Sequence, residues 1–491
     1  MKILQNQKFK IALALFLLIF SFGVIWALIV PGNNEAPDEA SHLNMINFLK
    51  TERRIPVFNN EPKIIPTQYN PGLLSGAYYS MAYNSPLSYL PYLLFNKQSS
   101  ISKPAIFPQR LVSSLFIAGF SLLLFLALCR LKPEKQAAAL ATTLFISLIP
   151  EIIYVAGYIN IEPIALFMAA LTFYLYTFLR PDQFKNYLYF GLSLAILALM
   201  KANYYIFIGY LVLLMLADLT DRLERPQRFQ KYLWLLIIFV GLNSWWWWHN
   251  WGLYHDPLII SYIKREIVDK APEWFKSMRD QGYNQITIFT NHYFYQFTFK
   301  GFFANLGGAN IFLPIYFYWL FYATLIVFVA KAGRVLGESR KYYLSFAIIT
   351  VAALAYFANK NLDDFSPQGR HLFPLLIPLA VIIFYGLSDI REKFQKWWRL
   401  GLPIFALVSS LYGLFLTIDQ YYVKGIAYAN QSNKAAHLLN FSWWHPSREG
   451  FSDLIRLFRL PKYGVGILIV CLIITLLLFS LALMTKPRRF T

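Results

Sequence analysis

Residues 11–30 read IALALFLLIFSFGVIWALIV, an apolar run that contains no charged residue. At 1.5 Å per residue, a helix of this length spans about 30 Å, which is the thickness of the hydrocarbon core of a bilayer. The run follows a basic N-terminal stretch and leaves through WALIVPG, without a small-residue cleavage site. We therefore predict an uncleaved first transmembrane helix rather than a signal peptide.

Apolar runs of spanning length recur along the rest of the chain. The composition agrees, because 57% of the 491 residues are hydrophobic and 18% are aromatic, which is more than a soluble core needs. We predict an all-α polytopic membrane protein that forms a single transmembrane unit over residues 1–491. About twelve spans are expected, near residues 11–30, 110–129, 136–150, 160–179, 186–200, 203–218, 232–249, 311–330, 342–358, 371–387, 400–417 and 463–484.

The formal charge of +20 is carried mainly by short basic clusters between the apolar runs. Such clusters are typical of membrane anchors and not of a nucleic-acid surface. They fall in alternate loops, so both termini are predicted to be cytoplasmic. The long loops of the opposite, outer side are residues 31–109, 250–310 and 418–462, and YNSPLSYLPYLLF (83–95) in the first of them is typical of an interfacial helix.

The stretch NNEAPDEASH, residues 33–42, follows the first apolar run directly and contains Glu35, Asp38, Glu39 and His42. His42 lies about one helical turn after the last two acids, so these side chains can share one helix face. A proline followed by two acids also fits an ordinary helix start. In the functional alternative, a partly desolvated carboxylate deprotonates a hydroxyl, or the cluster binds a divalent metal such as Mg²⁺ or Mn²⁺.

Cations at the outer ends of other spans are candidates for binding a phosphate. Arg370 lies in the tight turn SPQGRH between Gln368 and His371, and its planar guanidinium can grip a phosphate with two N–H groups. Lys201 and Arg110 are second candidates for the same role. Each of these cations can instead be an interfacial anchor.

Another apolar run begins at Glu162 at the predicted outer face, and Asn160 lies just before it. An ionisable residue beside a span is costly and is therefore a functional candidate, although an acid followed by proline also fits a helix start. Four consecutive tryptophans, residues 245–248, favour an aromatic belt at the interface over a sugar-stacking platform. No glycine-rich spacing suited to a nucleotide phosphate is present.

Five stretches together resemble a family of bacterial membrane proteins that is catalogued as a domain of unknown function and grouped with the GT-C glycosyltransferase superfamily. They are PDEASHLNMINFLKTERRIPV, YNSPLSYLPYLL, NIEPIALFMAALTFYLY, WWWWHNWGLYHDPL and FSPQGRHLFPLLIPLA, and they occur in the order of the family. Two positions depart from its pattern: NIEP replaces Asn-Asn-Asp, and Asn84-Ser85 replaces His-Pro.

The resemblance implies a multi-pass enzyme of the bacterial cytoplasmic membrane with its active site on the outer face. Such an enzyme transfers a sugar from a polyprenyl-phosphate donor to an envelope glycan, lipid or protein acceptor, in contact with membrane lipids. By motif position, Asp38 is the base that acts on the acceptor hydroxyl, with Glu39 and His42 in support and a divalent metal in some members. The expected reaction is an inverting displacement, which needs no second carboxylate as nucleophile.

Three alternative functions fit the same topology. A glycan ligase or polymerase with a lipid pyrophosphate donor is the first, and the acidic motif directly after the first span favours single-sugar transfer over it. A lipid-linked sugar transporter or flippase is the second, but transporters commonly carry repeated halves and polar groups at mid-membrane. Here the ionisable residues gather at one face. The third is a non-catalytic membrane partner.

Overall fold

The computed structural model of the chain describes residues 2–31, 36–57, 81, 84–95, 103–180, 182–219, 225–262, 265, 276–308, 310–334 and 339–423. The predicted span at residues 463–484 and most of the predicted loop 418–462 lie outside these residues. Within the described ranges the named elements are all helical, and the one β-type pairing is an isolated bridge between Leu306 and Ile311.

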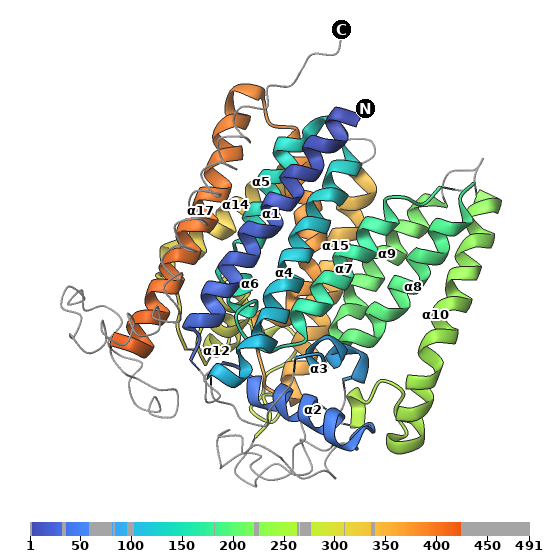
Figure 1. The fold of residues 1–491 in the computed structure, drawn as a ribbon, viewed down its shortest axis with the longest axis vertical. Helices are drawn as coiled ribbons and strands as arrows, with labels where there is room; N and C mark the ends of the chain where they lie inside the picture. The colour runs from blue at the N-terminus through green and yellow to red at the C-terminus, as the bar shows by residue number, and fades with distance from the viewer. Residues whose placement is uncertain are drawn as a thin grey trace.

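The long helices stand side by side and form the body of the molecule (Figure 1). They are α1 (Lys2–Ile29), α4 (Lys103–Leu131), α5 (Gln136–Ser147), α7 (Glu162–Tyr176), α8 (Phe184–Met200), α9 (Tyr205–Asp218), α10 (Arg225–Tyr254), α14 (Ile315–Ala332), α15 (Ser339–Asp363), α16 (Leu376–Ser388) and α17 (Glu392–Ile418). Every predicted apolar run except the last coincides with one of them. The predicted run 136–150 stops early at Ser147, because Pro150 interrupts the helix and begins the short α6 (Pro150–Val155).

Six helices of the described residues are long and apolar enough to cross a membrane. Three shorter apolar helices accompany them. The chain is therefore a multi-pass helical membrane protein, while the number of twelve spans stays a prediction. The six are Lys8–Ile29, Ile106–Leu131, Ile315–Ala332, Ser339–Asp363, Gly369–Ser388 and Phe394–Tyr421.

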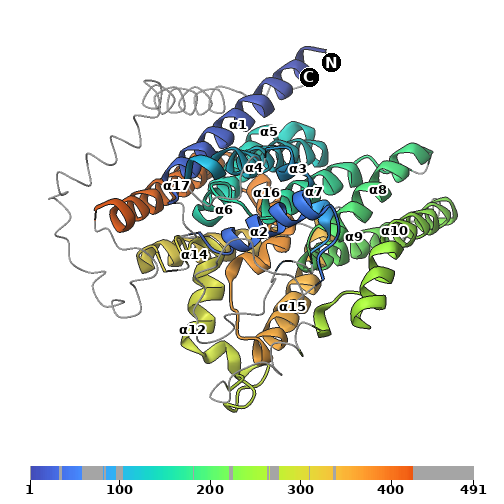
Figure 2. The same cartoon turned by 60° about the horizontal axis from the view of Figure 1, so that its bottom comes forward.

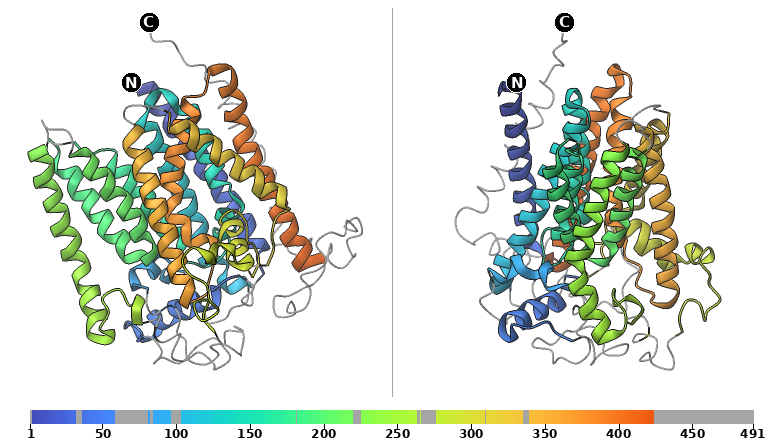
Figure 3. Two further views of the ribbon diagram at one scale, coloured as in Figure 1. Left: turned by 180° about the vertical axis from the view of Figure 1, so that it is seen from behind. Right: turned by 90° about the vertical axis from the view of Figure 1, so that its right-hand side faces the viewer.

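Short helical elements gather at one end of the bundle, opposite the N-terminal end of α1 (Figure 1). Figure 2 looks towards this end, where α2 crosses the middle of the bundle, and Figure 3 shows the same arrangement from behind and from the side. The elements are α2 (Glu39–Glu52), η1 (Pro86–Tyr89), α3 (Leu90–Leu93), α6, η3 (Ala202–Tyr204), η4 (Thr287–Thr290), α12 (His292–Tyr295), η5 (Gln296–Lys300), α13 (Gly301–Phe303) and η6 (Gly369–Leu375).

The predicted interfacial segment 83–95 belongs to this end and forms η1 and α3 over its described residues. It is tied to the spans by side chains: the Ser88 hydroxyl donates to the Met200 carbonyl at 2.6 Å, and the Tyr92 hydroxyl contacts the Ser113 hydroxyl at 2.8 Å. The Leu94 side chain is 80% exposed. The segment thus packs on the helix ends with one face and leaves apolar residues on the other.

The span made of η6 and α16 occupies the centre of the bundle. Every residue of α16 is buried, because α5, α14 and α15 all pack against it. The segment SPQGRH leads into η6, so the central span carries Arg370 at the same end as α2. This position places a predicted phosphate ligand in the middle of the cluster of short elements.

The turn at Gly369 requires glycine because two backbones meet there. A Cβ at this position would lie 1.9 Å from the Phe302 amide nitrogen and 2.1 Å from the Gly301 carbonyl carbon.

We expect Gly369→Ala to force η6 away from α13 and to lower the free energy of unfolding by about 1–3 kcal/mol. Gly401→Ala is the matched control, since its Cβ would meet no atom within 4 Å. The unfolding temperatures of both variants in detergent measure the effect. An unfolding temperature of Gly369→Ala equal to that of the wild type and of Gly401→Ala would contradict the expectation.

Candidate functional site

The chain enters α2 through an unusual backbone conformation at Asp38. The helix begins at Glu39 and not at Pro37, and Asp38 is the N-cap residue with φ 62° and ψ 2°. A non-glycine residue in this left-handed region is uncommon, although aspartate tolerates it better than most residues. The Asp38 side chain accepts no capping hydrogen bond from the helix. Strained backbone of this kind is often found at functional sites.

The Asp38 carboxylate instead meets the Arg370 guanidinium, which lies 332 residues further along the chain. The Nη2 group of Arg370 donates to Oδ2 of Asp38 in an ion pair. The other guanidinium nitrogens are held as well: Nε donates to Oε1 of Gln368 at 2.8 Å, and Nη1 donates to the Tyr158 hydroxyl at 2.8 Å. The Arg370 side chain is 6% exposed and that of Asp38 is 25% exposed, so the carboxylate remains reachable.

The charge state of Asp38 follows from these neighbours. Burial by itself raises the pKa of the Asp38 carboxyl, but the Arg370 guanidinium beside it opposes this effect. The Arg370 guanidinium, with smaller contributions from His42 and Lys201, holds the pKa of the Asp38 carboxyl below its ordinary value. Asp38 is therefore an ionised carboxylate near neutral pH, close to a cation that can be shared with a ligand.

His42 lies deeper on α2 and is held by an aromatic partner. Its Nδ1 atom lies 3.0 Å from the Tyr89 hydroxyl, which also accepts a hydrogen bond from the Asn84 side-chain amide at 3.4 Å. Burial lowers the pKa of His42 to about 3, although Asp38 opposes the shift, so the imidazole is neutral at pH 7. Asn84, one of the two positions that depart from the family pattern, thus belongs to the surroundings of a predicted site residue.

Glu39 and Arg110 form a buried ion pair with each other. Nε of Arg110 donates to Oε1 of Glu39 at 2.9 Å and Nη2 donates to Oε2 at 2.6 Å, with the side chains 0% and 3% exposed. The carbonyls of Ala27, Val30 and Pro31 accept the remaining N–H groups of the guanidinium.

All five donors of Arg110 are therefore used within the protein. The Glu39 carboxylate is also engaged a third time, by the backbone N–H of Ile159 at 3.0 Å. This geometry disagrees with the predicted roles of Glu39 as a helper of the base or metal ligand and of Arg110 as a phosphate ligand. Both residues instead join the end of α1 to α2 and α4, because their charges compensate each other in a buried place.

Glu162 and Lys201 form another pair beside the site. Glu162 begins α7, as predicted, and its backbone N–H donates to Oδ1 of Asn160 at 2.9 Å. Its carboxylate accepts from the Lys201 ammonium and, at 2.7 Å, from the Tyr204 hydroxyl. Lys201 is thus paired with a protein acid, although its side chain keeps 15% of its surface exposed.

The predicted metal ligands do not assemble. Among the described residues, no group of three His, Cys, Asp or Glu side chains is placed to bind a metal ion. At this site Glu39 is paired with Arg110, Asp38 is paired with Arg370, and Nδ1 of His42 contacts the Tyr89 hydroxyl. Glu35 lies outside the described residues.

The prediction from sequence missed a buried acid, Glu151, at the start of α6. Its side chain accepts the backbone N–H of Asn305 at 2.7 Å, and the residue is 5% exposed. Burial raises the pKa of Glu151 to about 8, although the Asn305 hydrogen bond and the Arg370 charge oppose the shift. The available sequence signal was an acid directly after a proline at the end of an apolar run.

Glu151 makes stability depend on pH in a defined direction. Its pKa in the folded protein exceeds the ordinary 4.5, so its contribution to stability is full below about pH 4.5 and is lost as the pH rises towards 8. We expect Glu151→Gln, which keeps an acceptor for Asn305, to be more stable than the wild type by about 1–3 kcal/mol at pH 8.5. At pH 5 the difference should nearly vanish.

Thermal unfolding of the purified protein in detergent at the two pH values measures this effect. The exposed Glu134 provides the control, since Glu134→Gln should leave the pH dependence of the wild type unchanged. An equal pH dependence in wild type and Glu151→Gln would show that Glu151 does not change its protonation state on folding.

These observations define a multi-pass helical membrane protein with buried and partly buried ion pairs gathered at one end of its spans. A family model described as "Predicted membrane protein (DUF2142)" matches residues 74–379. The chain belongs to this family, which confirms the predicted membership in a family of membrane proteins known only as a domain of unknown function. No curated protein matches the chain.

Two solved structures with a similar backbone arrangement come from Archaeoglobus fulgidus. One is its oligosaccharyltransferase in the apo form, with 12% sequence identity and a TM-score of 0.47. The other is the archaeal oligosaccharyltransferase AglB in complex with an inhibitory peptide and a dolichol-phosphate, with 13% identity and a TM-score of 0.46. Each match covers 91% of this chain and 63% of the other, so the chain spans less than two thirds of these longer proteins.

Proposed function

We propose that this protein is a GT-C-type glycosyltransferase. It moves a sugar from a polyprenyl-phosphate donor to an envelope glycan, lipid or protein acceptor on the outer face of a bacterial cytoplasmic membrane. The observation that carries the proposal is the pair of Asp38 and Arg370 at one end of the spans. A reachable carboxylate and a cation suited to phosphate lie in direct contact there, and sugar transfer from a lipid phosphate requires both kinds of group.

In the proposed reaction the acceptor hydroxyl gives its proton to Asp38 while its oxygen attacks the anomeric carbon of the donor sugar. The bond between that carbon and the phosphate oxygen breaks, and the polyprenyl phosphate leaves with the electron pair. Asp38 then releases the proton to water. One displacement inverts the anomeric configuration and needs Asp38 only as a base, with no carboxylate nucleophile.

The contact between the two groups suggests an order of binding. Without donor, the Arg370 charge holds the pKa of Asp38 low, which makes the carboxylate a weak base. A donor phosphate next to Arg370 brings negative charge that offsets the guanidinium, so the basicity of Asp38 increases when the donor is bound. Tyr158 and Gln368 keep the guanidinium in place through the change. We also propose that the chain crosses the membrane about twelve times and that both termini are cytoplasmic.

The test is sugar transfer by the purified protein in lipid nanodiscs. Radiolabelled polyprenyl-phosphate sugars are offered with envelope acceptors, with and without a chelator, and the anomeric configuration of the product is determined. We expect label in the acceptor with inverted configuration and release of polyprenyl phosphate. A chelator-sensitive rate would support the predicted divalent metal.

Other results would favour the alternatives. Transfer from pyrophosphate-linked donors alone would indicate a glycan ligase or polymerase. Movement of the intact labelled lipid across a proteoliposome membrane, without release of polyprenyl phosphate, would indicate a transporter. Either result would overturn the proposed reaction.

A further inference from the structure

The buried acid at the start of α6, Glu151, has no basic partner of its own. Among the described residues its carboxyl group makes no ion pair within 4.0 Å, and its one hydrogen bond is accepted from the backbone N–H of Asn305. A buried acid without a cation is costly, so its presence calls for a reason beyond packing. The other acids of the site are each paired with a basic side chain: Asp38 with Arg370, Glu39 with Arg110 and Glu162 with Lys201.

Glu151 is joined to the turn that carries Arg370 through the loop after α13. A Cβ built on Gly301 would lie 3.3 Å from the Gly369 amide nitrogen and 3.5 Å from Cβ of Asn305, so Asn305 and the Gly369 turn pack around the same point of α13. The hydrogen bond from Asn305 to Glu151 holds this loop against α6. Glu151 therefore supports the surface on which the turn before Arg370 rests.

A second connection runs through the segment that follows α6. The Tyr158 hydroxyl accepts a hydrogen bond from Nη1 of Arg370 at 2.8 Å. The Tyr158 ring packs on that of Tyr154 in α6, with ring centroids 5.0 Å apart. The segment that begins with Glu151 thus ends at a phenol that holds the Arg370 guanidinium.

The groups around Glu151 leave Arg370 as the charge that acts on it among the described residues. Arg110 of α4 lies at the same end of the bundle, but Glu39 compensates its charge. The remaining titratable groups close enough for the Glu151 charge to act on them are phenols, which are neutral near pH 7. They are Tyr154 of α6, Tyr158 after it and Tyr318 of α14.

The charge on Glu151 changes within an accessible range of pH. Burial raises the pKa of Glu151 to about 8 against the opposing charge of Arg370. The carboxyl group is therefore mostly protonated at pH 7 and mostly ionised at pH 9. Arg370 thus acts on one ionised carboxylate, Asp38, at pH 7 and on a second one at pH 9.

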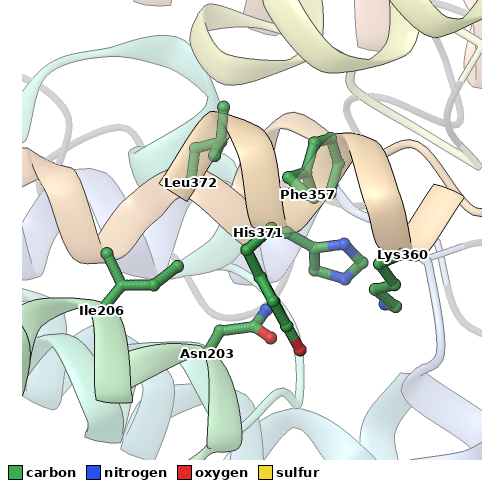
Figure 4. Close-up of a pocket in the computed structure, with 7 residues that line it drawn as sticks. Asn203, Ile206, Phe357, Lys360, His371 and Leu372 are labelled. Atoms are coloured by element: carbon green, nitrogen blue, oxygen red, sulfur yellow. The ribbon is translucent and has the colours of Figure 1, made fainter. Parts of the chain in front are cut away.

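The next residues of η6 are fixed by packing against another helix. Figure 4 shows His371 and Leu372 with Phe357 and Lys360 of α15 and Ile206 of α9. The His371 and Phe357 rings meet edge to face, with centroids 5.9 Å apart. These side chains leave no room for a ligand between them. η6 is therefore held against α15 after Arg370 and against α13 before it.

We propose that Glu151 is a positioning residue for Arg370. Its neutral carboxyl group supports the loop on which the Arg370 turn packs, and its ionised form competes with the donor phosphate for the guanidinium. The inference rests on the proposed function, in which Arg370 binds that phosphate, and adds its regulation by pH. Because Glu151 acts through Arg370, it should change donor binding and not proton transfer at Asp38. Bound donor should in turn favour the protonated form of Glu151.

The test follows KM for the donor and kcat from pH 7 to pH 9.5 in lipid nanodiscs. In the wild type we expect KM to rise by about 3–10-fold over this range, since a negative charge appears near the cation. Glu151→Gln stays neutral and keeps an acceptor for Asn305, so its KM should equal that of the wild type at pH 7 and lack this rise. Groups that titrate elsewhere in the protein affect both proteins equally.

Two further variants separate the charge of Glu151 from its hydrogen bond. Glu151→Leu has no acceptor for Asn305, and we expect it to raise KM for the donor by about 5-fold at pH 7 with little change in kcat. Glu134→Gln, at an exposed acid, is the control and should keep the pH dependence of the wild type. If Glu151→Leu does not fold, the comparison of wild type with Glu151→Gln still decides.

Equal pH dependence of KM in wild type and Glu151→Gln would overturn the proposed competition. A folded Glu151→Leu protein with the KM of the wild type at pH 7 would overturn the positioning role. A loss of kcat in Glu151→Leu at unchanged KM would also overturn it, because the effect would then not pass through donor binding.

Binding of polyprenyl phosphate, followed by native mass spectrometry, separates this inference from the proposed function. The ligand titrates identically with both proteins, so only their difference counts. If the wild type transfers no sugar but loses affinity relative to Glu151→Gln as the pH rises, the link between Glu151 and Arg370 holds and the transferase is rejected. Sugar transfer with the same pH dependence in both proteins rejects the link and retains the transferase.

Discussion

Asp38→Asn is expected to lower the rate of sugar transfer by about 10²–10⁴-fold, the usual contribution of a general base. The asparagine side chain has nearly the same shape and can still accept the hydrogen bond from Arg370, but it cannot take a proton from the acceptor. The left-handed conformation at this position is also compatible with asparagine. The fold should therefore survive while the proposed chemistry is lost.

Initial rates of wild type and Asp38→Asn with the same donor and acceptor measure the effect. Asp182→Asn, the same change at an exposed acid between α7 and α8, should leave the rate unchanged. Thermal unfolding of each variant checks that the protein is intact. Transfer at the wild-type rate by a folded Asp38→Asn protein would remove Asp38 as the base, and the unusual entry to α2 would then be a structural feature.

Arg110→Met is expected to lower the free energy of unfolding by about 3–5 kcal/mol, the typical effect of breaking a buried ion pair. The variant leaves the Glu39 carboxylate buried without its cation and removes the donors to the carbonyls of Ala27, Val30 and Pro31. The connection between α1, α2 and α4 is weakened as a result. Thermal unfolding in detergent and the yield of folded protein measure the loss.

The double variant Arg110→Met with Glu39→Leu separates the two parts of this effect. It removes both charges, so no unpaired carboxylate remains and a large part of the lost stability should return. If Arg110→Met is instead as stable as the wild type and binds polyprenyl phosphate more weakly, the sequence-based prediction of Arg110 as a phosphate ligand would be right.

The helical architecture could be predicted well, with exceptions that have local causes. The run 11–30 and the later apolar runs coincide with helices over the described residues, because the hydrocarbon core demands long apolar segments with internal hydrogen bonds. Pro150 shortened one predicted helix by removing a backbone donor. The start of α2 at Glu39 instead of Pro37 shows the usual uncertainty at helix ends.

The candidate site was predicted in part. Asp38, His42 and Arg370 were chosen from sequence and lie in one cluster, yet no spacing could show that Asp38 and Arg370 contact each other. Glu151 was missed, since it looks like an ordinary acid at the end of an apolar run. Its significance depends on the groups of other helices that face it.

By itself the sequence determined that this chain crosses a membrane as a bundle of helices, because the composition of each run decides locally whether it can lie in lipid. It also indicated the end of the bundle at which charged residues gather. Only the tertiary structure decided which charges are compensated. Asp38 and Glu39 are neighbours in sequence, but Asp38 is the N-cap residue in a left-handed conformation and Glu39 is the first residue of the helix, so their side chains point in different directions. One carboxylate therefore meets Arg370 at a reachable site, and the other meets Arg110 in the interior.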